Sequence, residues 1–368
     1  MSAATPALSH DTPPRIGALA SGALDAITDV PGVTVGHATH ASGDVQTGVT
    51  VVHAHGQDPY RHKVPAGVAV INGFGKSVGL LQLEELGQLE TPIALTNTFS
   101  TSAMAQAQIR ECVERNPETG RAWSTVNPLV LECNDGYLND IQRMVLGEAD
   151  YRQASAEAQA QFAQGAVGAG RGMSSFQLKG GVGSASRRAP LLDGSTYTVG
   201  ALVLANYSVM QQLVWGGVQV GVGIAALLDD DARMQAQAAE KGSIIMLLAT
   251  DAPLDARQLK RLALRAAAGL ARTGSVYGHG SGDIALAFST AYTLPHLAET
   301  PMPQVAMVHE TLMDGLFVAA ADAVEQAIVH ALWHAEPVQG RNGHSRPCIR
   351  ELLSRLRAPA VPSPDSRS

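Results

Sequence analysis

Alternation of apolar and polar positions predicts short strands along the whole chain. Runs rich in β-branched residues with a period of two are typical of strands with one buried face. Such runs cover residues 26–40 (a turn leading into a strand), 48–55, 66–72, 92–97, 130–132, 197–206 and 284–289, and another begins at Ser243.

Helical spacing of apolar residues appears between these runs. It covers residues 80–89, 100–115, 149–164, 254–271 and 307–335. Strands and helices mix without a strict alternation, and no repeat of 20–50 residues is present. We expect one domain of layered α/β architecture, with helices covering both faces of the sheets.

The segment that leads into the strand at Ser243 is unusual. An acidic, Ala/Gln-rich segment, residues 229–240, precedes the strand and is typical of a solvated helix or linker. The pair Gly242-Ser243 then leads into an apolar run. Taken alone, the pair fits an ordinary turn before a strand. It also suits a chain that is cut before Ser243, which would make this serine a new N-terminus.

Composition narrows the class of protein. Of 368 residues, 45% are hydrophobic, only 4% are aromatic and 37 are glycine, so a large core would be packed with small side chains. A net charge of −7 without a basic run argues against a nucleic-acid partner. Residues 1–15 lack the apolar segment of a signal peptide, and no run reaches the roughly 20 residues that span a bilayer, so we expect a cytoplasmic protein without a membrane partner.

Several familiar functional motifs are incomplete or absent in this sequence. Gly75-Lys76-Ser77 follows a strand, but a P-loop needs glycine where Val70 stands. His53 and His55 lie on one strand face without a third ligand at a recognisable spacing, so we expect no metal site and no cofactor. No GxSxG elbow is present. The three cysteines form no disulfide pattern, which favours a reducing compartment.

A few polar residues lie at strand ends and turns. Ser281 and Asp283, at i and i+2, would share one face if a strand begins there. Asn206 closes an apolar strand, and Tyr137 follows Glu132 in a dense polar turn. Each of these fits an ordinary structural role when it is taken alone.

Six blocks taken together resemble a known family. In chain order they are residues 27–37, 132–140, 179–187, 242–245, 249–254 and 280–283. They are similar to the L-aminopeptidase/D-amidase-esterases and β-peptidyl aminopeptidases, and the resemblance extends from about Ile27 to about Ala335. It implies an αββα sandwich that resembles the N-terminal nucleophile hydrolases but is connected differently.

The resemblance also implies a precursor that cuts itself between Gly242 and Ser243. Residues 1–242 would form the larger chain and residues 243–368 the smaller one, and the two would stay together as one domain. Members are typically homo-oligomers of such pairs, often tetramers. The implied substrates are small peptides, amides or esters with an N-terminal β-amino acid or a D- or L-alanyl residue.

Site residues are implied by the same resemblance. Ser243 matches the nucleophile, and Ser281 with Asp283 matches a supporting pair in which β-peptidyl members carry Glu as the acid. Asn206 matches the amide that holds the oxyanion. Tyr137 matches a pocket tyrosine, and Glu132 matches a carboxylate that binds the substrate amino group.

Two alternatives stay open from the residues. Ornithine acetyltransferase-like acyl transfer also uses a self-cleaved nucleophile, although that group uses threonine. A non-enzymatic scaffold of the same fold is the other alternative.

Overall fold

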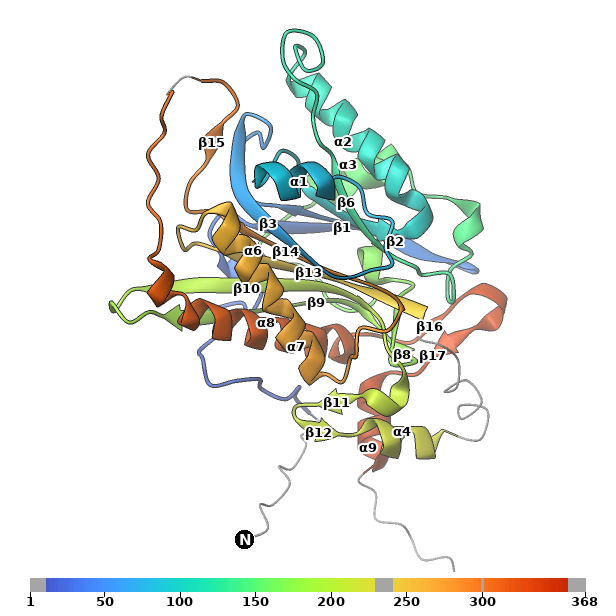
Figure 1. Ribbon diagram of the computed structural model, residues 1–368. Coiled ribbons are helices and arrows are strands. Elements are labelled where there is room, and N and C mark those ends of the chain that lie inside the picture. The colour runs from blue at the N-terminus through green and yellow to red at the C-terminus, as the bar shows by residue number, and fades with distance from the viewer. Residues whose placement is uncertain (1–10, 229–240, 299–300, 357–368) are drawn as a thin grey trace, which may run out of the picture.

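Two large β-sheets stack face to face in the computed structural model, which describes residues 11–228, 241–298 and 301–356 (Figure 1). The smaller sheet has the order β1 (Thr34–Ser42), β2 (Val45–His53), β5 (Ile93–Asn97), β6 (Leu129–Cys133). The larger sheet has the order β15 (Leu294–Pro295), β3 (His62–Gly73), β14 (Gly280–Ser289), β13 (Lys241–Thr250), β10 (Thr196–Asn206), β9 (Gly181–Pro190), and β4 (Gln88–Leu89) pairs with β3.

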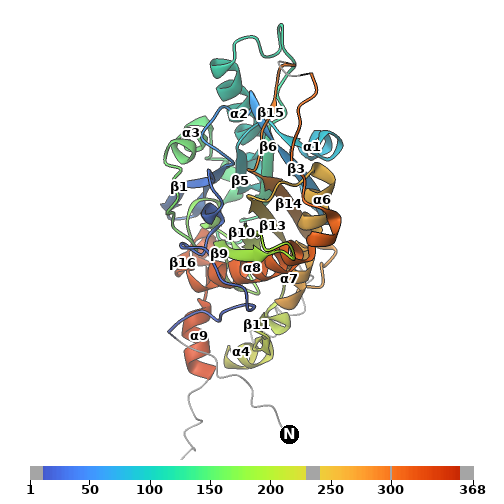
Figure 2. The ribbon, with the colours of Figure 1, turned by 90° about the vertical axis from the view of Figure 1, so that its left-hand side faces the viewer.

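Helices cover the outer face of each sheet, as Figures 1 and 2 show. The smaller sheet carries α2 (Thr101–Arg115) and α3 (Glu148–Ala156), and the larger sheet carries α6 (Ala256–Leu264), α7 (Ala266–Arg272) and α8 (Asp314–Trp333). The predicted αββα sandwich is therefore confirmed. Shorter elements lie around these layers: α1 (Leu80–Leu86), α4 (Gly221–Leu227), α9 (Ile349–Leu356) and the pairs β7–β8 (Ser174–Ser175, Leu178–Lys179), β11–β12 (Val214–Trp215, Val218–Gln219) and β16–β17 (Val338–Gln339, Ser345–Arg346).

Because side chains alternate along β13, this one strand contributes residues to two hydrophobic cores. Ile245 and Leu247 pack between the two sheets, whereas Ile244 and Met246 pack toward the helices. Because both faces of β13 are buried, its sequence contains a continuous apolar run without polar positions between. By the same alternation, Ser243 points to the side of the sheet that faces the smaller sheet.

The predicted strands and helices are confirmed in kind, but several helix lengths were wrong. The expected helix over residues 254–271 is two helices, α6 and α7, and the expected helix over 149–164 ends at Ala156. Residues 88–89, assigned to a helix, form β4, because the chain leaves α1 at Gly87 in a left-handed conformation. The acidic segment 229–240 and the chain after residue 356 lie outside the described residues.

Strand β9 was missed, and its sequence shows why. It is rich in Gly, Ser and Arg, yet most of it is buried under α8. At Gly183 a Cβ atom would lie 2.0 Å from the carbonyl oxygen of Ala327, so the helix backbone occupies the space of a side chain. α8 is long and apolar enough to span a membrane by length and composition, and its burial against β9 and β10 accounts for that composition.

Candidate active site

Ser243 is the third residue of β13 and lies between two neighbouring strands. It is paired with Asn206 of β10 on one side and with Gly282 of β14 on the other, and it is 5% exposed. Its Oγ donates to the carbonyl oxygen of Gly242 at 2.7 Å and accepts from the backbone N–H of Gly282 at 3.2 Å. The hydroxyl is therefore held against the peptide bond that precedes its own residue.

Gly242 occupies a position that admits no side chain. A Cβ atom there would lie 2.3 Å from the carbonyl oxygen of Asn206 and 2.7 Å from Cα of Tyr207. Both obstacles are backbone atoms, which cannot rotate away as the end of a side chain could. The close approach explains the glycine before Ser243.

Ser281 and Asp283 lie on one face of β14, as their spacing predicted, and form a hydrogen-bonded pair. Ser281 Oγ donates to Asp283 Oδ1 at 2.5 Å, and both residues are fully buried. By strand alternation they lie on the same side as Ala285, which packs toward the helices, and thus on the opposite side of the sheet from Ser243 Oγ. Ser281 is aligned with Gly242 across the β13–β14 pairing, so the pair lies behind the Gly242–Ser243 bond.

The side-chain amide of Asn206 is fixed from both ends. Its Oδ1 accepts from the backbone N–H of Ser174 at 2.8 Å, and its Nδ2 donates to the carbonyl oxygen of Asn134 at 2.9 Å. A donor on one side and an acceptor on the other define which end carries the N–H groups. Nδ2 keeps a second N–H beyond the one given to Asn134, at the residue paired with Ser243.

A buried lysine holds the backbone that carries Ser174. Lys179 Nζ donates to the carbonyl oxygens of Gly170, Met173 and Gly180 at 3.0, 2.8 and 2.7 Å. Burial lowers the pKa of this ammonium to about 7. The three contacts anchor the segment just before Ser174, and through it the orientation of the Asn206 amide.

Glu132, the residue before the last of β6, is a buried carboxylate that accepts from two donors. Oε1 accepts from the backbone N–H of Lys76 at 2.8 Å, and Oε2 accepts from Thr98 Oγ1. A carboxylate offers about four lone-pair sites, so acceptor capacity remains for a cation. Sequence reasoning missed Thr98, whose place directly after the predicted strand 92–97 was the available signal.

Tyr137 stacks on residues near the C-terminus. Its ring lies 4.6 Å from that of His344 at an interplanar angle of 13°, and the Arg346 guanidinium carbon lies 3.7 Å from its centroid. The turn before it is anchored by Asp135, which accepts from Thr47 Oγ1 at 2.6 Å. Tyr137 is thus connected to Asn206 through Asn134 of the same turn, and its role in the pocket stays a prediction.

Two further contacts at the site were missed. Cys133 Sγ donates to the carbonyl oxygens of Ser243 and Leu204 at 3.4 and 3.5 Å. Asn72 Nδ2 donates to the carbonyl oxygens of Gly278 at 3.0 Å and of Ser281. Both side chains bond to the backbone of distant segments, which no local pattern reveals.

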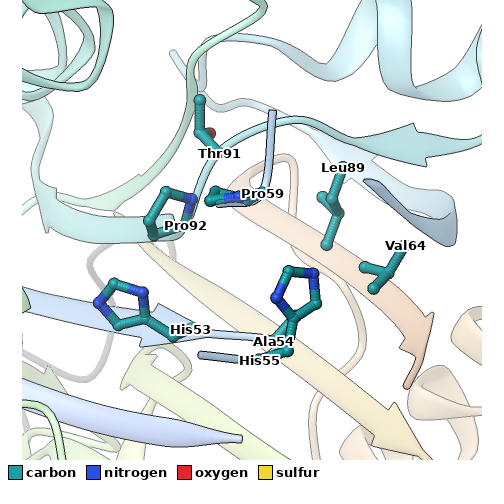
Figure 3. Close-up of a pocket in the computed structure, with 8 residues that line it drawn as sticks. All are labelled: His53, Ala54, His55, Pro59, Val64, Leu89, Thr91 and Pro92. Carbon is teal, nitrogen blue, oxygen red and sulfur yellow. The ribbon is translucent and has the colours of Figure 1, made fainter. Parts of the chain in front are cut away.

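The pair of histidines noted in the sequence borders a different pocket. Figure 3 shows this pocket, lined by His53, Ala54, His55, Pro59, Val64, Leu89, Thr91 and Pro92. The ring of His53 contacts Ser155 Oγ at 3.1 Å, and that of His55 contacts the carbonyl oxygen of His62 at 2.7 Å. Val64 lies nine residues before Gly73 on β3, about 30 Å along the strand, so the pocket is remote from Ser243. Within the described residues, no group of three His, Cys, Asp or Glu side chains could hold a metal ion.

The geometry around Ser243 suits acyl transfer. A buried hydroxyl lies against a carbonyl group, a fixed amide is paired with it across the strand, and a buried carboxylate lies near the end of the nearby strand β6. Positioned donors of this kind stabilise the oxyanion that forms when a nucleophile attacks a carbonyl.

Comparison with known proteins agrees with this arrangement. The sequence profile of peptidase family S58 matches residues 25–346. A β-peptidyl aminopeptidase of Sphingosinicella xenopeptidilytica is 38% identical over 344 residues, which cover 87% of this chain and 83% of that protein.

Solved structures give the same result. A β-aminopeptidase of Burkholderia sp. superposes with a TM-score of 0.83 at 41% identity, covering 93% of this chain and 96% of that one. The L-aminopeptidase D-Ala-esterase/amidase of Ochrobactrum anthropi, described as a prototype serine aminopeptidase with a variant of the N-terminal nucleophile hydrolase fold, superposes with a TM-score of 0.84 at 35% identity, covering 92% and 95%. The resemblance and the fold class that it implied are confirmed.

The cysteines offer a test of which nucleophile can act. Cys112, Cys133 and Cys348 are buried and form no disulfide, and burial raises the pKa of Cys112 and Cys348 to about 11 and that of Cys133 well above its usual value. We expect no fast-reacting thiol in the native protein at pH 8 and three after denaturation, counted with a chromogenic disulfide reagent. Rapid labelling of the native protein with loss of activity would contradict this burial and would implicate a cysteine in the chemistry.

Proposed function

This chain belongs to peptidase family S58 and is a hydrolase of the N-terminal nucleophile type, and from that premise we propose that it cuts itself before Ser243 and then acts as an aminopeptidase on small peptides, amides or esters. The observation that carries the proposal is the position of Ser243 Oγ. It lies 2.7 Å from the carbonyl oxygen of Gly242, at a junction where only glycine fits.

That position supports self-cleavage, which we write as two steps. Ser243 Oγ attacks the carbonyl carbon of Gly242, its proton passes to the departing nitrogen, and the peptide bond becomes an ester. Water then hydrolyses the ester, which leaves a carboxylate on Gly242 and a free α-amino group on Ser243. The products are residues 1–242 and 243–368, held together because β13 is paired on both sides within the larger sheet.

Cleavage supplies the base that the serine lacks. A hydroxyl is a weak nucleophile without an adjacent base. An unperturbed α-amine has a pKa of about 7.7–8.0, so part of it is neutral near pH 7 and can accept the hydroxyl proton. An amide nitrogen cannot do this, so the uncut chain is inactive in this account.

The surrounding residues take the remaining roles. The free N–H of Asn206 Nδ2 stabilises the oxyanion on the substrate carbonyl. Ser281, aligned with Gly242 and bonded to Asp283, receives and orients the new ammonium group. Glu132 binds the amino group of the substrate, which limits cleavage to the N-terminal residue, and Tyr137 borders the pocket.

The substrates and the assembly are proposed from relatives. Their names describe cleavage of β-peptides by one group and of L-amino acid and D-alanyl substrates by another, and we assign small substrates of these kinds to this chain. The acyl-transferase alternative is not favoured, because its nucleophile is threonine and the matched proteins are aminopeptidases. The processed pairs assemble as a homo-oligomer, with a tetramer as the expected form.

Replacement of Gly242 by Ala tests the cleavage geometry. The added methyl group meets two backbone atoms and displaces the Gly242 carbonyl from Ser243 Oγ. Since a shift of about 1 Å in a reacting group can cost about 100-fold in rate, we expect cleavage to slow at least tenfold, measured as the decay of the intact band on a denaturing gel. Gly56→Ala is the matched control, because a Cβ atom there has no neighbour within 4 Å. Equal cleavage rates in the two variants would refute the proposed approach of Ser243 to this bond.

Glu132→Gln tests recognition of the substrate amine. The variant keeps the acceptor for the Lys76 N–H and the shape of the side chain, and removes the charge. A hydrogen bond to a charged group contributes about 1.5–3 kcal/mol, so we expect kcat/KM for β-alanyl, L-alanyl or D-alanyl p-nitroanilide to fall about 10–100-fold, mainly through KM. Cleavage of the chain should remain complete, and Glu157→Gln, at an exposed position, is the control. An unchanged KM would remove Glu132 from this role.

A further inference from the structure

The glycine turn of residues 73–76 packs on Gly282, the residue paired with Ser243. A Cβ atom on Gly282 would be 2.8 Å from the carbonyl oxygen of Phe74 and 3.1 Å from Cα of Gly75. Gly282 is the residue whose N–H donates to Ser243 Oγ. The absence of side chains at Gly75 and Gly282 therefore lets the turn rest on the strand beside Ser243.

The same turn contacts the carboxylate assigned to the substrate amine. The backbone N–H of Lys76 donates to Glu132 Oε1 at 2.8 Å, and a Cβ atom on Gly75 would be 3.7 Å from that oxygen. The backbone of residues 75–76 thus bridges from Gly282 to Glu132. The side chain of Lys76 therefore starts from a backbone that contacts both the strand beside Ser243 and Glu132.

Lys76 carries a cation at this border. Its side chain is exposed, and its Nζ lies 4.0 Å from the centroid of the Phe74 ring. The Phe74 ring is itself 52% exposed and lies 6.1 Å from the ring of His279. Within the part of the chain that the structure describes, the Lys76 ammonium has no carboxylate partner. An exposed cation on an exposed aromatic ring, beside a nucleophile, is a ready binding place for an anion with an apolar neighbour.

We propose that Lys76 binds the carboxylate of the residue that is released, so that dipeptides with a free C-terminus are the preferred substrates of this enzyme. The inference rests on the proposed function, since it takes Ser243 as nucleophile and Glu132 as the amine site. The Phe74 ring packs against the side chain of the released residue. A second positive charge at this place is repelled by Lys76, so a released residue with a basic side chain is disfavoured.

Length supports a dipeptide. Two extended residues span about 7 Å. Glu132 marks one end of that span and is hydrogen-bonded to the Lys76 backbone. The Lys76 ammonium marks the other end, because a four-carbon stem carries it away from that backbone. A dipeptide can contact both charges with its scissile carbonyl between them, on the side where the turn meets Gly282 and Ser243. The C-terminal carboxylate of a longer peptide lies beyond this reach.

The test compares acid and amide forms of one dipeptide. The N-terminal residue is whichever of β-alanyl, L-alanyl or D-alanyl is released fastest from its p-nitroanilide, and the second residue is phenylalanine with a free carboxylate or a carboxamide. We expect kcat/KM for the acid to exceed that for the amide about tenfold in the wild type. The ratio should approach one in Lys76→Met and fall below one in Lys76→Glu. Added salt should lower the ratio in the wild type, because it screens exposed charges.

Lys260→Met is the matched control, because Lys260 is an exposed lysine that pairs with Glu84 on the helix layer. Its acid-to-amide ratio should equal that of the wild type. A wild-type ratio near one, or a ratio unchanged in Lys76→Met, would overturn the role of Lys76 while release of nitroaniline still supports the aminopeptidase. A wild type that releases no nitroaniline from any of the three substrates would instead overturn the proposed function and this inference with it. A denaturing gel of each variant verifies that the chain has folded and been cut.

Discussion

The pairing of β13 between β10 and β14 is the constraint on which the site depends. It sets Ser243 beside Asn206 on one strand and beside Gly282 on the other, and it aligns Ser281 with Gly242. Because β13 packs against the second sheet on one face and against helices on the other, a shift by one residue would exchange the side chains of the two cores and turn Ser243 to the other face of the sheet. If the chain is cut before Ser243, as we propose, the same pairing keeps Ser243 in place.

Small residues provide the second requirement, close approach of backbone to backbone. Gly242 approaches β10, and Gly282 approaches the turn of residues 73–76. The composition, with 37 glycines and 4% aromatic residues, reflects the same packing, in which Gly183 also lets α8 lie on β9. At the site this packing lets the turn that carries Lys76 rest on Gly282, the residue paired with Ser243.

Local sequence patterns were enough to predict some of these features. Apolar patterns predicted β10, β13 and β14, and the i, i+2 spacing predicted that Ser281 and Asp283 share one face of a strand, where they form a hydrogen bond. The order of the strands and their register depend on pairing between distant segments, so Asn206 could be placed beside Ser243 only through the family resemblance and then the structure. β9 was not predicted, because the backbone of α8 packs directly on it and the strand therefore lacks the large apolar side chains that mark a buried strand. Lys76 meets Glu132 through a contact that spans 56 positions, and no local signal encodes it. Thr98 lies 34 positions from Glu132, and its place directly after a predicted strand was the one signal that it carried.

The proposed nucleophile can be tested directly on the purified protein. The most direct measurement is the intact mass of each chain in freshly purified, active enzyme, together with the N-terminal sequence of the smaller chain. The account predicts two chains, the smaller of which begins Ser-Ile-Ile-Met at Ser243, and a single uncut, inactive chain for Ser243→Ala. Active enzyme that consists of one intact chain, or an N-terminus at any other residue, would contradict it.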